Sequence, residues 1–543
     1  MPISPTYPGV YIDELPSAVR TIVGVPTSIA AFIGTASRGS VKGPVHITSF
    51  ADYEQEFGGL DPKHDMSYAV FQFFQNGGAE AEIVRVVNRT ASTADAGEEE
   101  AAPTPAAGEA TITLPGGVTL KAASPGRWAN DSLRARVDYG TAEDPGSKLY
   151  NLTIRDAETG ATETYLNVSI EAASPRNLKH VIASSGLIGE VAGETSRPTA
   201  HKAAGATGGP EEGEDPFKDG KGTGADAWYT AATGGEDGPA PVVGDYKGDR
   251  NAQTGLYALL KTDIFNMLCL PGAPGEIDGA ASIIAPALDL CVERRAMLIV
   301  DPKKNWASVN AAVTAVKDPT FKVSGEATRN AALYFPQIVQ PDPKQENAER
   351  AFPPCGAIAG IWSRTDVQRG VWKAPAGTEA SLNGVSNLTV PMTDRQNGLL
   401  NPIGVNCLRQ FPVVGNVVWG ARTRRGADVL ADQWKYLPVR RLALFIEESL
   451  FRGTQWVVFE PNDEPLWASI RLNVGAFMNN LFRQGAFQGR TPQEAYLVKC
   501  DSTNNPQNDI DRGIVNILVG FAPLKPAEFV IIHIQQLAGQ IQV

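Results

Sequence analysis

Apolar and polar positions repeat with strand-like and helical periods over most of this chain. In residues 21–90, two apolar runs predict strands, and two stretches with apolar residues three or four positions apart predict helices. The strands are expected at 28–34 and 82–87, and the helices at 50–57 and 66–75. Ser49 and Asp52 match a capping box at the start of the first helix, and Gly58 is its stop signal. We therefore expect a compact α/β unit here.

The pattern changes sharply after this unit. Residues 90–110 are mainly Ala, Thr, Glu and Pro, which is the composition of a linker or a loop. Alternating apolar positions return in 111–185 and predict a small β-rich module. Residues 186–255 are rich in glycine and polar side chains, so we expect much of this segment to lie on the surface without regular structure.

Residues 256–370 return to an α/β pattern. The nearly continuous apolar runs 265–271 and 296–301 are typical of buried parallel strands, with a helix expected between them over 283–293. A third strand is expected at 331–336.

The segment 400–525 has the strongest periodicity in the chain. Apolar residues at helical spacing predict one helix over 440–451 and another that begins at Pro465. Three further apolar runs predict strands, at 456–459, 496–500 and 514–521.

Both ends of the chain carry strand signals where a terminus would ordinarily fray. The C-terminal run 529–536 has apolar residues on both faces, and the N-terminal run 7–14 is set off by prolines. Because nothing nearby in the sequence covers these faces, we expect the end strands to complete sheets in other copies of the chain. The predicted arm residues are Val10, Tyr11, Ile12, Asp13, Phe529, Val530, Ile531, Ile532, His533, Ile534 and Gln535.

The amino-acid composition argues against several classes of function and of binding site. The net charge of −12 argues against nucleic-acid binding. The five cysteines are scattered without C-x-x-C spacing, which predicts neither a disulfide framework nor a zinc site and favours a reducing compartment. We expect neither a signal peptide at the start nor a membrane span, because no run of about 18 apolar residues occurs.

The sequence predicts no catalytic, cofactor-binding or metal-binding residues. Gly220-Lys221-Gly222-Thr223 is similar to part of a phosphate-binding loop, but it lacks the upstream glycine and the preceding strand. Asp301 follows a predicted strand, where α/β enzymes often place a carboxylate, although a turn residue before Pro302 also explains it. The five histidines are dispersed, and His533 reads as a structural residue within the last strand.

A local group of arginines stands out in this acidic chain. It comprises Arg409, Arg422, Arg424, Arg425, Arg440 and Arg441. Surface ion pairs with the abundant acids are one interpretation, and a contact surface for an acidic partner is the other. The tryptophans nearby, Trp419, Trp434, Trp456 and Trp467, are interpreted as core residues.

Several ungapped stretches resemble contractile tail sheath proteins of phages and of related bacterial contractile injection systems. They include Tyr7–Glu14, Ala357–Asp366, Arg369–Pro375, Asn401–Asn406, Val418–Thr423, Gly453–Asp463, Thr491–Tyr496 and Gly520–Phe529. The resemblance covers residues 1–90 and about 255–543, but not 91–250.

The resemblance implies a multidomain α+β and α/β fold with a discontinuous core, inserted outer domains and extended terminal strand arms. The expected divisions are an N-terminal arm (1–20), core (21–90), a β-rich and Gly-rich insertion (91–255), a middle α/β domain (256–375), core (376–525) and a C-terminal arm (526–543). It further implies six-subunit rings stacked helically around an inner tube, with baseplate and terminal cap proteins as other partners. Assembly in the cytoplasm is expected, without membrane insertion. A phage tail, a cell-anchored injector and a released particle all remain compatible with it.

Two other classes of function are compatible with the sequence. The insertion could present a glycan- or protein-binding face on a sheath scaffold, or it could be surface decoration. An enzyme with its site in the middle α/β segment, near Pro271 and Asp301, is the other alternative.

Overall fold

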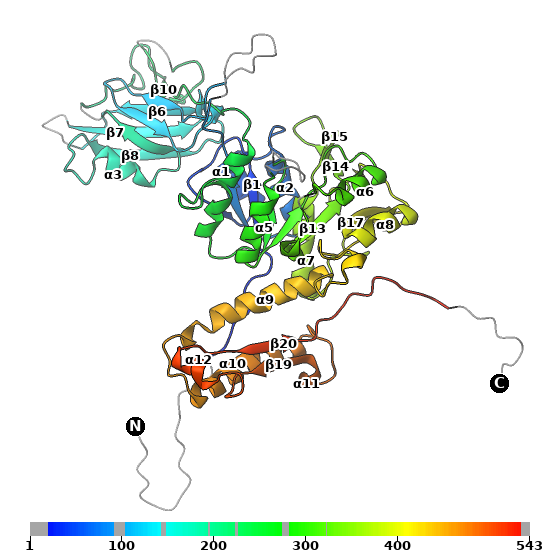
Figure 1. Ribbon diagram of the computed structural model, residues 1–543. Coiled ribbons are helices and arrows are strands. Elements are labelled where there is room, and N and C mark those ends of the chain that lie inside the picture. The colour runs from blue at the N-terminus through cyan, green and yellow to red at the C-terminus, as the bar shows by residue number, and fades with distance from the viewer. Residues whose placement is uncertain are drawn as a thin grey trace, which may run out of the picture.

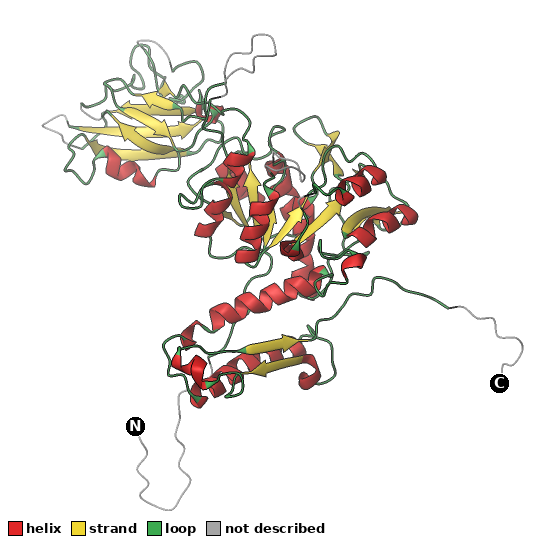
Figure 2. Ribbon diagram, viewed as in Figure 1, coloured by secondary structure: helices red, strands yellow, loops and turns green. Residues whose placement is uncertain are grey.

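A computed structural model describes residues 20–91, 104–142, 148–193, 196–222, 226–273, 282–321 and 323–533. The predicted arm residues Val10, Tyr11, Ile12, Asp13, Ile534 and Gln535 lie outside these ranges. The fold is mixed α/β with several sheets. Figure 1 shows three bodies: a β-rich body, a central body built on a large sheet, and a C-terminal lobe below it. Figure 2 shows strands and helices in all three.

The central sheet has eight strands, of which the inner six run parallel and the two edge strands run antiparallel to their neighbours. In sheet order they are β18 (Gly415–Val418), β17 (Val405–Phe411), β13 (Ala331–Phe335), β12 (Met297–Val300), β11 (Met267–Cys269), β1 (Ala30–Gly34), β3 (Ala81–Arg85) and β2 (Val45–Ile47). β1, β11, β12 and β13 are buried along their whole length, as parallel strands covered on both faces must be.

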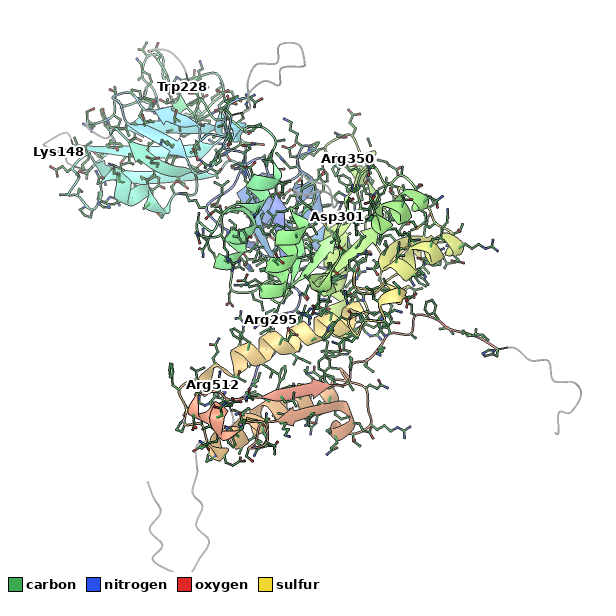
Figure 3. All side chains as sticks on the ribbon, in the orientation of Figure 1. Lys148, Trp228, Arg295, Asp301, Arg350 and Arg512 are labelled. Atoms are coloured by element: carbon green, nitrogen blue, oxygen red, sulfur yellow. The ribbon has the colours of Figure 1, made fainter. Side chains whose placement is uncertain are left out.

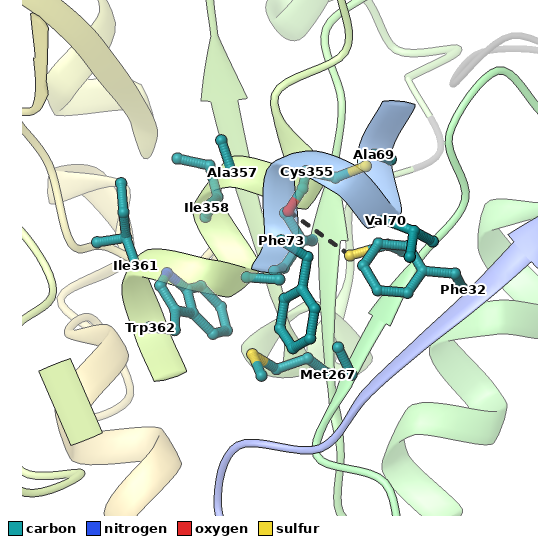
Figure 4. Packing of buried hydrophobic residues seen from close by; sticks show 14 of the residues in the cluster. Phe32, Ala69, Val70, Phe73, Met267, Cys355, Ala357, Ile358, Ile361 and Trp362 are labelled. Carbon is teal, nitrogen blue, oxygen red and sulfur yellow. Dashed lines mark hydrogen bonds between the residues drawn. The ribbon is translucent and has the colours of Figure 1, made fainter. Parts of the chain in front are cut away.

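Two hydrophobic cores lie on opposite faces of this sheet. One face is covered by α5 (Ile284–Glu293), α6 (Val309–Lys317) and α8 (Asp394–Leu400), and the other by α1 (Phe50–Phe57), α2 (Asp65–Gln75) and α7 (Cys355–Arg369). Figure 4 shows α2 and α7 packed together on the second face. Gly356 permits this close approach, since a Cβ there would lie 2.0 Å from the Ala69 carbonyl oxygen.

Most elements predicted in this body are present. The Ser49–Asp52 capping box starts α1, and Gly58 ends it in the left-handed conformation. The strands of residues 21–90 and those of 256–375 pair directly, β1 with β11. The structure therefore places these two segments in one sheet with a shared core. A smaller antiparallel sheet of β15 (Ala348–Phe352), β14 (Ile338–Asp342) and β16 (Asn387–Leu388) adjoins it, and the short α4 spans Val243–Lys247.

The β-rich body contains two antiparallel sheets around its own core. One sheet is β4 (Thr111–Thr113), β5 (Thr119–Ala122) and β9 (Ile188–Ala192). The other is β10 (Thr230–Ala231), β6 (Leu133–Asp138), β7 (Leu149–Asp156) and β8 (Thr162–Ser169), followed by α3 (Leu178–Val181). Two buried arginines of the central body hold this body in place. Arg38 pairs with buried Asp156 at 2.8 Å, and Arg85 donates to the Pro125 carbonyl at 2.9 Å.

The C-terminal lobe packs α9 (Leu437–Gly453) and α10 (Glu464–Arg483) against a two-stranded sheet of β19 (Tyr496–Lys499) and β20 (Leu518–Phe521). Two short helices, α11 (Pro492–Ala495) and α12 (Gln507–Asp511), complete it. The N-terminal part of α9 also contributes Leu437 and Leu444 to the central core, so this helix links the two bodies.

Two strand predictions in this lobe are corrected. The run 456–459 is not a strand: Gln455–Val457 is a 3-10 turn, and Phe459 has a left-handed backbone with φ of 69°. The run lies in the short connection between α9 and α10, and none of the described strands pairs with it. Of the predicted strand 514–521, only Leu518–Phe521 pairs with β19.

Within the described ranges, every helix is too short or too polar to cross a lipid bilayer. In the same residues, no three His, Cys, Asp or Glu side chains gather in a way that could hold a metal ion.

Candidate functional site

The C-terminal arm is attached to the central body by Glu528. Its carboxylate accepts two hydrogen bonds of 2.7 Å from the Arg422 guanidinium, one from Nε to Oε1 and one from Nη2 to Oε2. Asn401 Nδ2 donates to the same Oε1 at 2.9 Å, and the Tyr436 hydroxyl donates to Oε2 at 3.3 Å. A bidentate guanidinium–carboxylate pair fixes direction as well as distance, so Glu528 sets where the arm leaves the body.

The guanidinium that receives Glu528 is itself held from several sides. Arg422 is fully buried, and its remaining Nη1 donates to the carbonyls of Asn401 and Gly426 and to Asp428 Oδ1, at 2.9–3.0 Å. Asn406, on β17, bonds the backbone N–H and carbonyl of Arg422 through its side-chain amide. The receptor for Glu528 is therefore built by the central body.

The ionised form of Glu528 is favoured at this site. Burial opposes ionisation of the carboxyl, but the hydrogen bonds from Arg422 and Asn401 and the Arg422 charge outweigh it. The net effect lowers the pKa of Glu528 below its ordinary value. At neutral pH the anchor is thus a charge pair.

Beyond Glu528 the arm leaves the protein surface. Phe529, Val530, Ile531 and Ile532 are 70–81% exposed, and His533 is also exposed. In Figure 1 this segment runs away from all three bodies. The strand predicted for 529–536 is not formed in the described part, Phe529–His533. A strand needs a neighbour for its main-chain groups, and none of the described strands pairs with this segment.

An open cavity of about 770 Å³ lies at the base of the arm. Two indole rings, Trp372 and Trp419, line it together with Tyr436 and the arm residues Leu524 and Phe529. Trp419 is 38% exposed, which corrects its assignment to the core. Trp467 is buried as expected, and Trp434 and Trp456 are half-buried.

The arginine cluster is internal and does not form a basic surface. Arg409, Arg422, Arg424, Arg440 and Arg441 are buried, and only Arg425 is partly exposed. Five of them pair with acids of this chain: Arg409 with Asp394, Arg422 with Glu528, Arg425 with Asp432, Arg440 with Glu447 and Arg441 with Asp366. Arg424 donates instead to backbone carbonyls. Guanidinium groups suit such interior roles because one side chain satisfies several acceptors.

Glu528, Asn401 and Tyr436 were not among the predicted site residues. The sequence held one signal for Glu528, which is the only acidic residue between Gly513 and Val543. Nothing in the sequence connects it to Arg422, which lies 106 positions earlier.

The C-terminal lobe presents open strand edges. β19 and β20 pair only with each other among the described strands. Leu497 and Leu518, one on each strand, are more than half exposed. Because a two-stranded sheet leaves a row of unpaired N–H and carbonyl groups on each outer edge, it is a ready template for a further strand.

Asp301 lies at the carboxyl end of β12, as predicted, and Figure 3 labels it. Its Oδ1 accepts the backbone N–H of Cys355, at the start of α7, at 2.8 Å. Burial raises the pKa of Asp301 to about 7. The Cys355 thiol is also buried, and its pKa is raised, which makes it a poor nucleophile. This arrangement fits a structural cap on α7.

Two family descriptions match this chain. The phage tail sheath protein central domain matches residues 248–424, and the phage tail sheath C-terminal domain matches residues 431–536. The tail sheath protein of Vibrio phage KVP40 is 28% identical over 191 residues, which is 35% of this chain and 27% of that protein. A putative prophage major tail sheath protein of Pseudomonas aeruginosa (strain UCBPP-PA14) is 26% identical over 296 residues, covering 51% of this chain and 67% of that protein.

The fold is also similar to solved structures. The helical sheath of the anti-feeding prophage in its contracted state aligns with a TM-score of 0.53 at 22% identity, covering 98% of this chain and all of that one. Its likeness to the present chain is one of fold.

Proposed function

This chain belongs to the phage tail sheath family, and we propose that it is the repeating subunit of a contractile sheath. In this proposal, copies polymerise as stacked hexameric rings around an inner tube and contract to drive that tube through a target envelope. The role is structural and non-enzymatic. The other partners would be baseplate and terminal cap proteins, with assembly in the cytoplasm as part of a phage tail or an injection particle.

The observation that carries the proposal is the exposed, apolar C-terminal arm with an anchored base. Four consecutive large apolar residues, 529–532, are exposed to solvent directly after Glu528, which pairs with the buried Arg422. A monomer gains nothing from this arrangement, because exposed apolar surface promotes association. A subunit that offers a strand to a neighbour requires it.

The open edges of β19 and β20 supply a matching acceptor in the next copy. An added strand of four to six residues forms about four to six main-chain hydrogen bonds, each worth roughly 1 kcal/mol net. We propose that Phe529–Gln535 pairs there, and that the N-terminal arm residues Val10–Asp13 add to a neighbouring sheet in the same way. Such links hold copies together without a rigid interface between their domains.

Contraction then follows from the way the arms are joined. In this proposal the strand pairing joins neighbouring copies through their arms, so domains can rotate while the pairing persists. We propose that the extended lattice is metastable and that contraction moves subunits outward to bury more surface, without nucleotide hydrolysis. In the domain division that accompanies this proposal, residues 91–255 form an outer insertion, while the segments on either side build the shared core.

A truncation tests the role of the arm. Removing Phe529–Val543 leaves the Glu528 anchor intact, so we expect a folded monomer with an unchanged unfolding temperature that forms no tubes in negative-stain electron microscopy. In the full chain, Ile531→Pro removes one main-chain donor and is expected to weaken assembly, whereas Ile531→Thr keeps the donor and serves as control. Normal tubes from the truncated chain would contradict the proposal.

A further inference from the structure

The connection between α9 and α10 carries a phenylalanine that projects into solvent. Phe459 is fully exposed, and its neighbour Val458 is 63% exposed. The backbone of Phe459 has φ of 69°, a left-handed conformation that bulky residues rarely adopt. Strain of this kind persists only where the surrounding structure imposes it, and it is often associated with function.

Hydrogen bonds of the surrounding residues define the backbone of this turn. Asn462 accepts a hydrogen bond from Trp467 Nε1 at 2.8 Å and donates to the Ile514 carbonyl at 3.0 Å. Glu460 N–H bonds the Val457 carbonyl at 3.2 Å, directly across Phe459. The backbone that carries Phe459 is therefore fixed before contact, which lowers the entropic cost of inserting the side chain into a partner.

A receptor of suitable chemistry exists elsewhere on the same chain. The cavity of about 770 Å³ at the arm base is open to solvent and is lined by Trp372, Trp419 and Leu524. Trp419 and Leu524 are each 38% exposed. Indole faces favour an inserted aromatic ring through offset or edge-to-face contacts.

The charges around the two features are complementary. Glu460 lies beside the phenylalanine, exposed and without an ion pair among the described residues. Lys525, on the rim of the cavity, is also exposed and has no ion pair in the described part of the chain. Opposite charges at the rim of a contact steer association and set its register.

Phe459 cannot reach the cavity of its own chain. Tyr436, at the start of α9, lines the cavity, whereas Phe459 follows the end of that 17-residue helix. The two features thus lie about 25 Å apart along the helix, at opposite ends of it. A contact between different patches on identical copies is heterologous, and it generates rings or helical filaments.

We propose that Phe459 of one copy inserts into the cavity beside Trp419 of a second copy, with Glu460 facing Lys525. This contact rests on the proposed sheath function and adds a second link, distinct from the strand arms, between copies.

Cysteine cross-linking tests the contact directly. The chain with both Glu460→Cys and Lys525→Cys is assembled and oxidised, and the products are separated on a non-reducing gel. All five native cysteines are buried, so they contribute little background. We expect a ladder of linked multimers from the double variant and none from either single variant. Assembled tubes without a ladder, or linkage to a tube protein instead, would overturn the proposal.

Assembly of point variants provides a second measurement. We expect Phe459→Ala to raise the protein concentration needed for tubes by about tenfold or more, as loss of a buried aromatic anchor does. Val413→Ala, at another almost fully exposed apolar residue, is the matched control and should leave assembly unchanged. Glu460→Lys and Lys525→Glu should each impair tubes, and the two together should restore them.

The outcomes separate this contact from the sheath function. If the unaltered chain forms tubes and Phe459→Ala forms them equally well, the contact is wrong and the sheath function stands. If the unaltered chain forms no tubes, the sheath function itself fails.

Discussion

Glu528 and Arg422 form a bidentate ion pair with two N–O distances of 2.7 Å, and this pair joins the C-terminal arm to the central body. Arg422 is fully buried and Glu528 is half-buried, whereas the four residues directly after Glu528 are exposed. The pair is therefore the boundary between folded domain and free arm.

Breaking this pair should release the base of the arm. In Arg422→Ala, the Glu528 carboxylate loses both guanidinium bonds, and we expect the free energy of unfolding to fall by about 3 kcal/mol. Arg422→Lys keeps the charge but not the bidentate geometry, so it should recover only part of this loss. Limited proteolysis of the segment 523–528, together with thermal unfolding, measures both effects. Equal protection of the segment in all three proteins would show that the pair does not hold the arm.

Asp301 should make stability depend on pH. Its folded-state pKa of about 7 lies above the unfolded value of about 3.9, so the folded protein holds a proton that the unfolded chain releases. The contribution of Asp301 to stability is then highest below pH 4, falls as the pH rises toward 7, and is constant above pH 7. Asp301→Asn should flatten that slope in urea unfolding between pH 4 and 8. An unchanged slope would show that groups other than Asp301 cause the pH dependence of stability.

Arg441 should be one of the most sensitive residues of the cluster. It forms a buried bidentate pair with Asp366 on α7, and it also donates to the Thr27 carbonyl. Arg441→Ala leaves the buried Asp366 without its cationic partner, so we expect a loss of about 3–5 kcal/mol in chemical unfolding. Arg425→Ala is the matched control: its pair with Asp432 is partly exposed, and its loss should cost about 1 kcal/mol or less. Similar losses from both variants would contradict this ranking.

Gly356 should tolerate no side chain. An added Cβ would lie 2.0 Å from the Ala69 carbonyl oxygen, so Gly356→Ala must push α7 away from α2 and should cost about 1–3 kcal/mol or more. Gly475→Ala in α10 has open space around it and should instead stabilise the chain by about 0.5–1 kcal/mol. Differential scanning calorimetry of the two variants measures the expected loss of stability in one and the expected gain in the other. A neutral Gly356→Ala would show that the two helices are not in close contact.

The β-rich body should be removable. Its two connections lie side by side, since Asn88 Nδ2 donates to the Ala240 carbonyl at 3.4 Å. Replacing residues 92–237 with a short Gly-Ser linker leaves the central sheet complete, at the cost of the partners of Arg38 and Arg85. We expect a folded protein that still forms tubes, checked by thermal unfolding and electron microscopy. Failure to fold would show that the β-rich body is part of the folding core.

Some elements of this structure could be predicted from the sequence, and others could not. The capping box at Ser49 and the left-handed Gly58 were predicted correctly because both depend on residues within one turn of helix. The strands at 297–300 and 331–335 were predicted because complete burial requires uninterrupted apolar runs. The strand predicted at 456–459 was wrong, since this equally apolar run lies in a helix connection and pairs with none of the described strands.

The sequence by itself determined the local elements, the apolar ends of the chain and the family to which it belongs. Only the tertiary structure decided which charged side chains are buried and which groups they pair with. The six arginines look like a basic patch in the sequence, yet five are buried, because their acceptors come from distant segments such as Asp366 and Glu528. Local patterns report which face of an element is buried, but an ion pair across about a hundred residues exists only after folding has brought its two partners together.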